Sequence, residues 1–242
     1  MIAFKDRHNI VKLNIECLAK QSLVPAVVLV VSNIVDYKFA IDMSCKYKNV
    51  FLTIHRNYPI GGKWDAGVKY AKKLNVNGLM ILGSDDLLSL DYLKTCFHEL
   101  DMGNGSNGKG VDLIGSRSWY IYDTYNKLYE LEYNDKVKVT LGAGRMYSKY
   151  FLDAVGWNIF PIAQPFHLDS MGYERVVSFS NSLKIIKSEH FILCIKGNWE
   201  VINTSRNIIK SSDRISSTDV SNKISNIKGE LKILDLNKYT KI

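Results

Sequence analysis

Apolar runs of strand length alternate with amphipathic segments through the first part of the chain. The pattern predicts strands at residues 2–5, 25–32, 50–54 and 78–82, and helices at 9–20, 36–45, 63–74 and from Ser89 to about Leu100. Residues 25–32 form a continuous apolar run, which is typical of a strand buried on both faces. This order of elements predicts an α/β fold with a mainly parallel, doubly wound sheet flanked by helices.

The pattern changes beyond residue 101. A Gly- and Asn-rich stretch at 102–110 precedes strands that are polar and aromatic. The later elements that the sequence predicts are a hairpin at 119–123 and 127–133, a helix from Ser148 to Gly156 and a helix from Asp169 toward Phe179. From about Ser205 the chain is rich in Ser, Asn, Lys and Ile. We therefore expect a main domain at 1–204 and a less ordered appendage at 205–242.

The composition is that of a globular protein. The chain has 242 residues, of which 46% are hydrophobic and 23% charged, and this excludes a disordered or fibrous chain. No apolar run is long enough to span a membrane, and the first residues lack the apolar block of a signal peptide. We therefore expect a cytoplasmic protein. Cys17, Cys96 and Cys194 show no metal-type spacing, so we expect them to be buried free thiols.

The formal net charge of +8 favours anionic partners. The lysines are spread along the whole chain, and no zinc-finger, RRM or helix-turn-helix signature accompanies them. We therefore expect no nucleic-acid partner. The same positive field would suit a small substrate that carries phosphate.

The residues that could carry chemistry follow one predicted strand. The apolar run 79–82 ends in Gly83-Ser84-Asp85-Asp86, and ligands of open α/β sheets bind beyond the carboxyl ends of the strands. Two carboxylates there need a cation or hydrogen bonds. Because Mg²⁺ and Mn²⁺ bind carboxylate and diphosphate oxygens, Asp85 is a candidate metal ligand. The alternative is that Asp85 and Asp86 cap the following helix.

A second segment, Asn57 to Gly67, places glycines and Lys63 just before a predicted helix. Backbone amides at a helix start favour phosphate when a cation lies nearby, so Lys63 is a candidate for a diphosphate contact. The alternative is an ordinary turn with a helix cap. Lys196, which follows the apolar run 191–195, is a further candidate for a phosphate contact.

Together, the runs 57–67 and 79–86 resemble the nucleotide-binding half of GT-A glycosyltransferases, particularly family-2-like enzymes, viral and phage members included. The resemblance covers roughly residues 1–200. It implies a Rossmann-like GT-A fold, with a nucleotide-sugar-binding half at 1–101 and an acceptor half at 111–204 that contains the hairpin. It also implies a location in the host cytoplasm if the source is viral.

The resemblance implies the activity and the roles of particular residues. Asp85 corresponds to the ligand of Mn²⁺ or Mg²⁺, and Asp169 to the catalytic carboxylate that acts as general base in an inverting transfer. The nucleotide-sugar donor would be bound by Lys5, Asp6, Arg7, Lys63, Asp65, Ser84, Asp86 and Arg145. The acceptor would be a glycan, a protein or a lipid-linked molecule.

The chain departs from the family pattern at three places. Gly83 stands where the motif usually begins with an acidic residue, and Trp64-Asp65 replaces the usual Arg-Asn. Asn33 stands where many relatives carry an aspartate that contacts the nucleoside.

Two other functions stay open at this point. A sugar-phosphate nucleotidyltransferase would use a similar sheet but normally has a glycine-rich loop after the first strand, and residues 4–8 contain no glycine. A non-catalytic basic module that binds nucleic acid or polysaccharide would not need the two carboxylates at a strand end.

Overall fold

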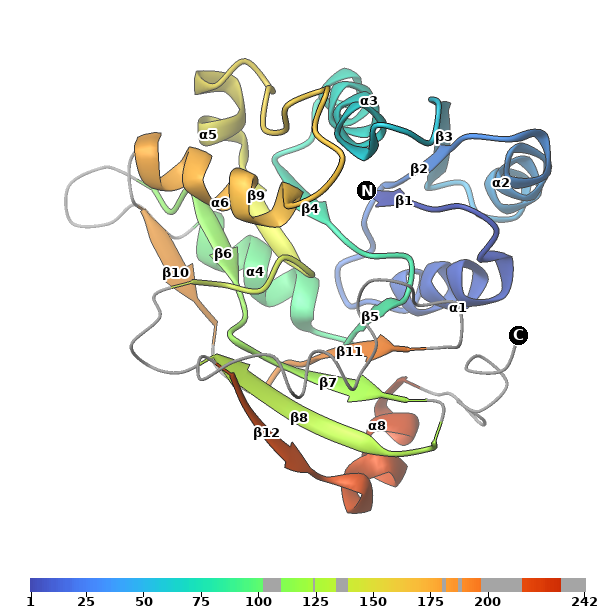
Figure 1. Cartoon of the computed structure of the whole chain (residues 1–242), viewed down its shortest axis with the longest axis vertical. Helices are drawn as coiled ribbons and strands as arrows, with labels where there is room; N and C mark the ends of the chain where they lie inside the picture. The colour runs from blue at the N-terminus through green and yellow to red at the C-terminus, as the bar shows by residue number, and fades with distance from the viewer. Residues whose placement is uncertain are drawn as a thin grey trace.

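A central sheet with helices on both faces organises the chain (Figure 1). The computed structural model describes residues 1–101, 110–123, 125–133, 139–179, 182–186, 189–196 and 215–231. The Gly- and Asn-rich stretch at 102–109 and most of the predicted appendage lie outside these ranges. Within them, every helix is too short or too polar to reach across a lipid bilayer.

The first half of the chain supplies parallel strands. β1 (Ile2–Ala3), β2 (Val27–Val31) and β3 (Val50–Ile54) pair in parallel in that order. The residue after β4 (Gly78–Ile81) forms a parallel bridge with β1, between Ile2 and Leu82. All five residues of β2 are buried, as its continuous apolar run predicts.

The second half extends the sheet beyond β4. The order β10-β6-β9-β4 joins β6 (Leu113–Gly115), β9 (Arg145–Ser148) and β10 (Leu183–Ile185). β9 runs antiparallel to both β4 and β6, whereas β10 is parallel to β6. Among the described strands of this combined sheet, β9 is the one that runs against the others, so the predicted, mainly parallel sheet is confirmed.

The helices cover the two faces through separate apolar clusters. On one face, α1 (His8–Leu18), α2 (Ile34–Lys46) and α4 (Tyr92–Asp101) contribute buried residues to a cluster that contains Leu29 of β2. On the other, α3 (Ile60–Lys73), α5 (Lys149–Ala154) and α6 (Leu168–Phe179) contribute buried residues to a cluster that contains Val28 and Val30 of β2. Burial of alternate β2 side chains on opposite faces follows from the two-residue period of a strand.

A second sheet lies below the first in the view of Figure 1. Its order is β12-β8-β7-β11-β5, built from β5 (Asp86–Leu88), β7 (Ser118–Tyr122), β8 (Leu128–Tyr133), β11 (Ile192–Ile195) and β12 (Ile215–Asp219). β7 and β8 form the predicted hairpin. The weak helix signals after residue 205 did not predict β12, which pairs with β8. A short 3₁₀ helix, Ser221–Lys223, and α8 (Ile224–Leu231) follow it.

Short-range sequence signals account for where some helices and strands begin and end. Ser148 caps α5 by accepting a hydrogen bond from the Phe151 N–H, and Gly156 adopts a φ of +65° after it. The alternative that Asp85 and Asp86 cap a helix is wrong, because Asp86 begins β5 and α4 starts only at Tyr92. Cys17, Cys96 and Cys194 are buried free thiols, as predicted.

Candidate active site

The carboxyl ends of β1, β2 and β4 bring three loops to one edge of the sheet. Because β9 pairs antiparallel to β4, with Arg145 opposite Ile81, the start of β9 lies at the same edge. The end of β11 also reaches it, since the Ile195 N–H donates to the main-chain oxygen of Asp85, 2.9 Å away. Residues far apart in the sequence therefore meet here.

Asp85 lies between two cations. Its Oδ2 accepts a hydrogen bond from Lys196 Nζ at 2.7 Å, and its Oδ1 is 3.7 Å from a guanidinium nitrogen of Arg7. The same nitrogen of Arg7 donates to Ser84 Oγ at 3.2 Å. Asp85 is only 7% exposed. The structure thus brings together three predicted site residues, Arg7, Ser84 and Asp85, and adds Lys196 to them.

Asp86 turns into the protein instead. Its Oδ2 accepts the Gly83 N–H at 2.9 Å, and its Oδ1 lies 2.7 Å from Cys194 Sγ. Burial and the neighbouring Asp85 raise the pKa of Asp86 to about 6, against the opposing effect of Lys196. Asp86 therefore holds the 83–86 turn together. This also explains Gly83, because a Cβ there would lie 2.3 Å from Asp86 Oδ2.

Lys63 lies beneath these loops. It belongs to the first turn of α3 and is 1% exposed. Its ammonium group contacts the Phe4 carbonyl, Asn57 Oδ1 at 3.0 Å and Ser32 Oγ at 3.4 Å. Burial lowers its pKa to about 8. Lys63 thus links the segments that follow β1, β2 and β3.

Asp65 lies on the same helix as Lys63. Its carboxylate pairs with Lys69 Nζ at 2.7 Å, an ion pair between residues four positions apart along α3.

The loop after β1 is held by a buried carboxylate that the sequence analysis missed. Asp36 is fully buried and accepts hydrogen bonds from the Asp6 N–H at 3.0 Å and from Asn33 Nδ2 at 2.8 Å; His8 Nε2 also lies 2.8 Å from it. Asp6 has a φ of +56°. The side chains of Asp6 and Lys5 are both exposed. An N-cap residue followed three positions later by a carboxylate is the signal that could have identified this pair.

Asp169 lies in the first turn of α6, over Gly142. A Cβ at position 142 would lie 2.2 Å from Asp169 Cγ. Gly144, in the same turn, donates its N–H to the Ile81 oxygen at 3.2 Å, which ties this turn to the end of β4. Asp169 therefore lies at the sheet edge that also carries Asp85.

Arg145 contacts the Asp169 segment from inside the protein and holds it in place. Its guanidinium contacts the main-chain oxygen of Asp169, and it donates to Thr140 Oγ1 at 2.9 Å and to the Thr140 oxygen at 2.7 Å. Arg145 is buried, whereas Asp169 as a residue is exposed to solvent, with its carboxyl against Gly142. Dense protein around the Asp169 carboxyl raises its pKa, and Arg145 opposes that shift. A carboxylate with a raised pKa on an exposed residue is suited to accept a proton.

The sequence matches no protein-family model and no curated protein, but solved structures share its architecture. TarS residues 1–349 from S. aureus, in complex with UDP-GlcNAc, superimposes with a TM-score of 0.58 at 14% identity, over 84% of this chain and 60% of that chain. The mannosyltransferase PcManGT from Pyrobaculum calidifontis, with GDP-Man and Mn²⁺, gives 0.55 at 12% identity, over 81% and 55%. The chain has the GT-A fold. It spans less than two thirds of the length of either protein.

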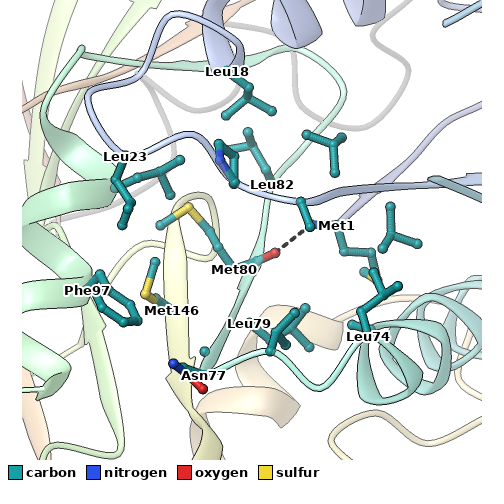
Figure 2. Close-up of a pocket in the computed structure, with 18 of the residues that line it drawn as sticks. Met1, Leu18, Leu23, Leu74, Asn77, Leu79, Met80, Leu82, Phe97 and Met146 are labelled. Atoms are coloured by element: carbon teal, nitrogen blue, oxygen red, sulfur yellow. Dashed lines mark hydrogen bonds between the residues drawn. The ribbon is translucent and has the colours of Figure 1, made fainter. Parts of the chain in front are cut away.

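A cavity of about 330 Å³ lies elsewhere in this GT-A fold (Figure 2). It is lined by apolar side chains that include Leu23, Leu79, Met80 and Met146, and it lies at the amino ends of β2 and β4. The charged groups described above lie at the carboxyl ends of these strands. This apolar cavity and the candidate active site are therefore different places.

The fit of a divalent cation to Asp85 can be judged from its donor set. Such a cation coordinates carboxylate oxygens, but the Asp85 oxygens face Lys196 and Arg7, and both oxygens of Asp86 have protein partners. In the part of the chain that the structure describes, no three His, Cys, Asp or Glu side chains cluster as metal ligands. These residues do not fit a protein-held Mn²⁺ or Mg²⁺.

Proposed function

We propose that this chain is a glycosyltransferase that moves a sugar from a nucleotide-sugar donor to an acceptor hydroxyl. The observation that carries the proposal is that Arg7, Lys196 and Asp169 all lie at the carboxyl edge of a GT-A sheet. Solved structures hold TarS in complex with UDP-GlcNAc and PcManGT in complex with GDP-Man and Mn²⁺, which supports this class of donor. The motifs at 57–67 and 79–86 support a family-2-like enzyme.

The donor would lie along the edge from β2 to β9. The nucleoside is assigned to the loop that contains Lys5 and Asp6, next to Asn33. The diphosphate is assigned to Arg7 and Lys196, because guanidinium and ammonium groups bind phosphate oxygens. The sugar would then point toward Gly142 and Asp169, so residues 1–101 bind most of the donor and residues 111–204 receive the acceptor.

The reaction would be a single displacement. The acceptor oxygen forms a bond to the anomeric carbon, and the bond from that carbon to the diphosphate oxygen breaks with its electron pair going to the diphosphate. The hydroxyl proton goes to the Asp169 carboxylate. Attack from the face opposite the leaving group inverts the anomeric carbon. The products are a glycoside and a nucleoside diphosphate.

Product analysis tests this proposal. The full chain is incubated with UDP-GlcNAc or GDP-mannose and a panel of glycan acceptors, and nucleoside diphosphate and glycoside are measured together. We expect both products to appear in equal amounts. Pyrophosphate release from a nucleoside triphosphate and a sugar phosphate would instead indicate a nucleotidyltransferase. Tight binding of nucleic acid without nucleotide turnover would indicate a binding module.

A further inference from the structure

We propose that Lys196 and Arg7, in place of a divalent cation on Asp85, neutralise the diphosphate of the donor. The inference rests on the proposed function and names the groups that would stabilise its leaving group. It starts from the ion pairs of Asp85: one carboxylate oxygen contacts Lys196, and the other lies near Arg7. We refer to these three residues as the Asp85 cluster.

Lys196 is held in place by its main chain and its side chain. Its N–H donates to the Tyr122 oxygen at 2.8 Å, at the end of β7, and the preceding Ile195 N–H donates to Asp85. The Lys196 side chain is 12% exposed, whereas that of Lys223, which pairs with Glu130 on β8, is 46% exposed. Lys196 is therefore a positioned cation, since its ammonium group does not have to be ordered when an anion binds.

Arg7 reaches the cluster from the loop after β1. It lies at the N-cap position of α1, and its guanidinium contacts both Ser84 Oγ and the Asp85 carboxylate. A guanidinium carries five N–H donors and an ammonium three, so each group can contact Asp85 and an anion together. The two cations come from segments on either side of the 83–86 turn.

The charge of the cluster favours an anion. Asp85 contributes one negative charge and the two basic residues one positive charge each, so these three side chains sum to +1. The neighbouring Asp86 carboxylate turns away from them, toward the Gly83 N–H and the Cys194 thiol. A divalent cation on Asp85 would displace an ion pair and lie next to two like charges. A diphosphate is negatively charged, so the same two cations would attract it. Asp85 is then a positioning residue for Lys196 and Arg7, and the electron pair that the leaving diphosphate gains is stabilised by these two cations.

Binding of UDP and GDP by calorimetry, in EDTA and in Mn²⁺, tests the inference on the full chain. We expect either UDP or GDP to bind, and to bind with the same affinity in EDTA and in Mn²⁺. Lys196→Gln and Arg7→Gln should each weaken diphosphate binding roughly 10- to 100-fold and leave binding of the free nucleoside unchanged. Lys223→Gln, which also removes an ion-paired lysine, is the matched control and should bind as the wild type does.

The outcomes separate the two proposals. Binding that disappears in EDTA and returns with Mn²⁺ or Mg²⁺ overturns this inference but leaves the glycosyltransferase proposal standing. Unchanged diphosphate affinity in both Lys196→Gln and Arg7→Gln also overturns it. If no nucleotide binds in either buffer, both proposals fail. The two variants change different elements, so a folding defect in one leaves the other as the test.

Discussion

Asp85 and Asp169 lie at the same edge of the sheet but in different surroundings. Asp85 is nearly buried and contacts two cations, Lys196 and Arg7. Asp169 is exposed to solvent, and the basic residue next to it, Arg145, contacts its main-chain oxygen. One carboxylate therefore has its charge compensated by side chains, whereas the other belongs to a residue that is exposed to solvent.

This difference suggests a division of labour. A paired carboxylate fixes the position of the cations around it, which suits the binding of an anion. A carboxylate on an exposed residue whose pKa is raised suits proton transfer. On the donor side, the cations around Asp85 would then bind the diphosphate. On the acceptor side, Asp169 would act as the base.

The largest expected effect comes from the acceptor side. Asp169→Asn removes the proton acceptor but keeps the size of the side chain, so turnover should fall by about 10²- to 10⁴-fold while nucleotide affinity stays unchanged. Steady-state kinetics and calorimetry on the same variant measure both quantities. Glu174→Gln, on an exposed position of the same helix, is the control. Normal turnover in Asp169→Asn would show that Asp169 is not the general base.

Asp86 predicts a pH dependence of stability on the donor side. Its folded pKa of about 6 lies above the ordinary value of 3.8 for an aspartate, so the folded state binds more protons than the unfolded state between these values. Asp86 therefore contributes to the free energy of unfolding at low pH. This contribution, on the order of 3 kcal/mol, is lost as the pH rises through about 6. Urea unfolding from pH 4 to 7 should show this loss in the wild type but not in Asp86→Asn. A pH-independent difference between the two would contradict it.

Two glycine substitutions test the donor side and the acceptor side independently. Their expected effects are smaller than those of the aspartate substitutions. Alanine at Gly142 would meet the Asp169 carboxyl, and alanine at Gly83 would meet Asp86. A displacement of about 1 Å can cost up to ~10²-fold in rate. We therefore expect Gly142→Ala to lower kcat roughly 10- to 100-fold with normal donor binding, and Gly83→Ala to weaken donor binding. If both variants change the same parameter, the two sides do not act separately.

The sequence predicted what local patterning controls. The bounds of β3, the capping of α5 by Ser148 and the hairpin of β7 and β8 follow from short-range signals. The glycosyltransferase resemblance also identified the strand end that carries Asp85.

The parts that it did not predict depend on contacts between distant residues. Asp86 turns inward because the Gly83 N–H and the Cys194 thiol donate to its carboxylate oxygens, and Asn14 donates to its main-chain oxygen. The bond from Lys196 to Asp85 joins positions 111 residues apart. The burial of Lys63 likewise depends on three segments that meet only in the folded sheet. No spacing along the chain encodes these pairings.

A crystal structure of the chain with a bound nucleoside diphosphate tests the central claim most directly. The account predicts phosphate oxygens within hydrogen-bonding distance of Arg7 and Lys196, the nucleoside against the loop that contains Asp6, and Asp169 facing the open side of the diphosphate. A nucleotide bound at another edge of the sheet, or with its phosphates away from both cations, would contradict it.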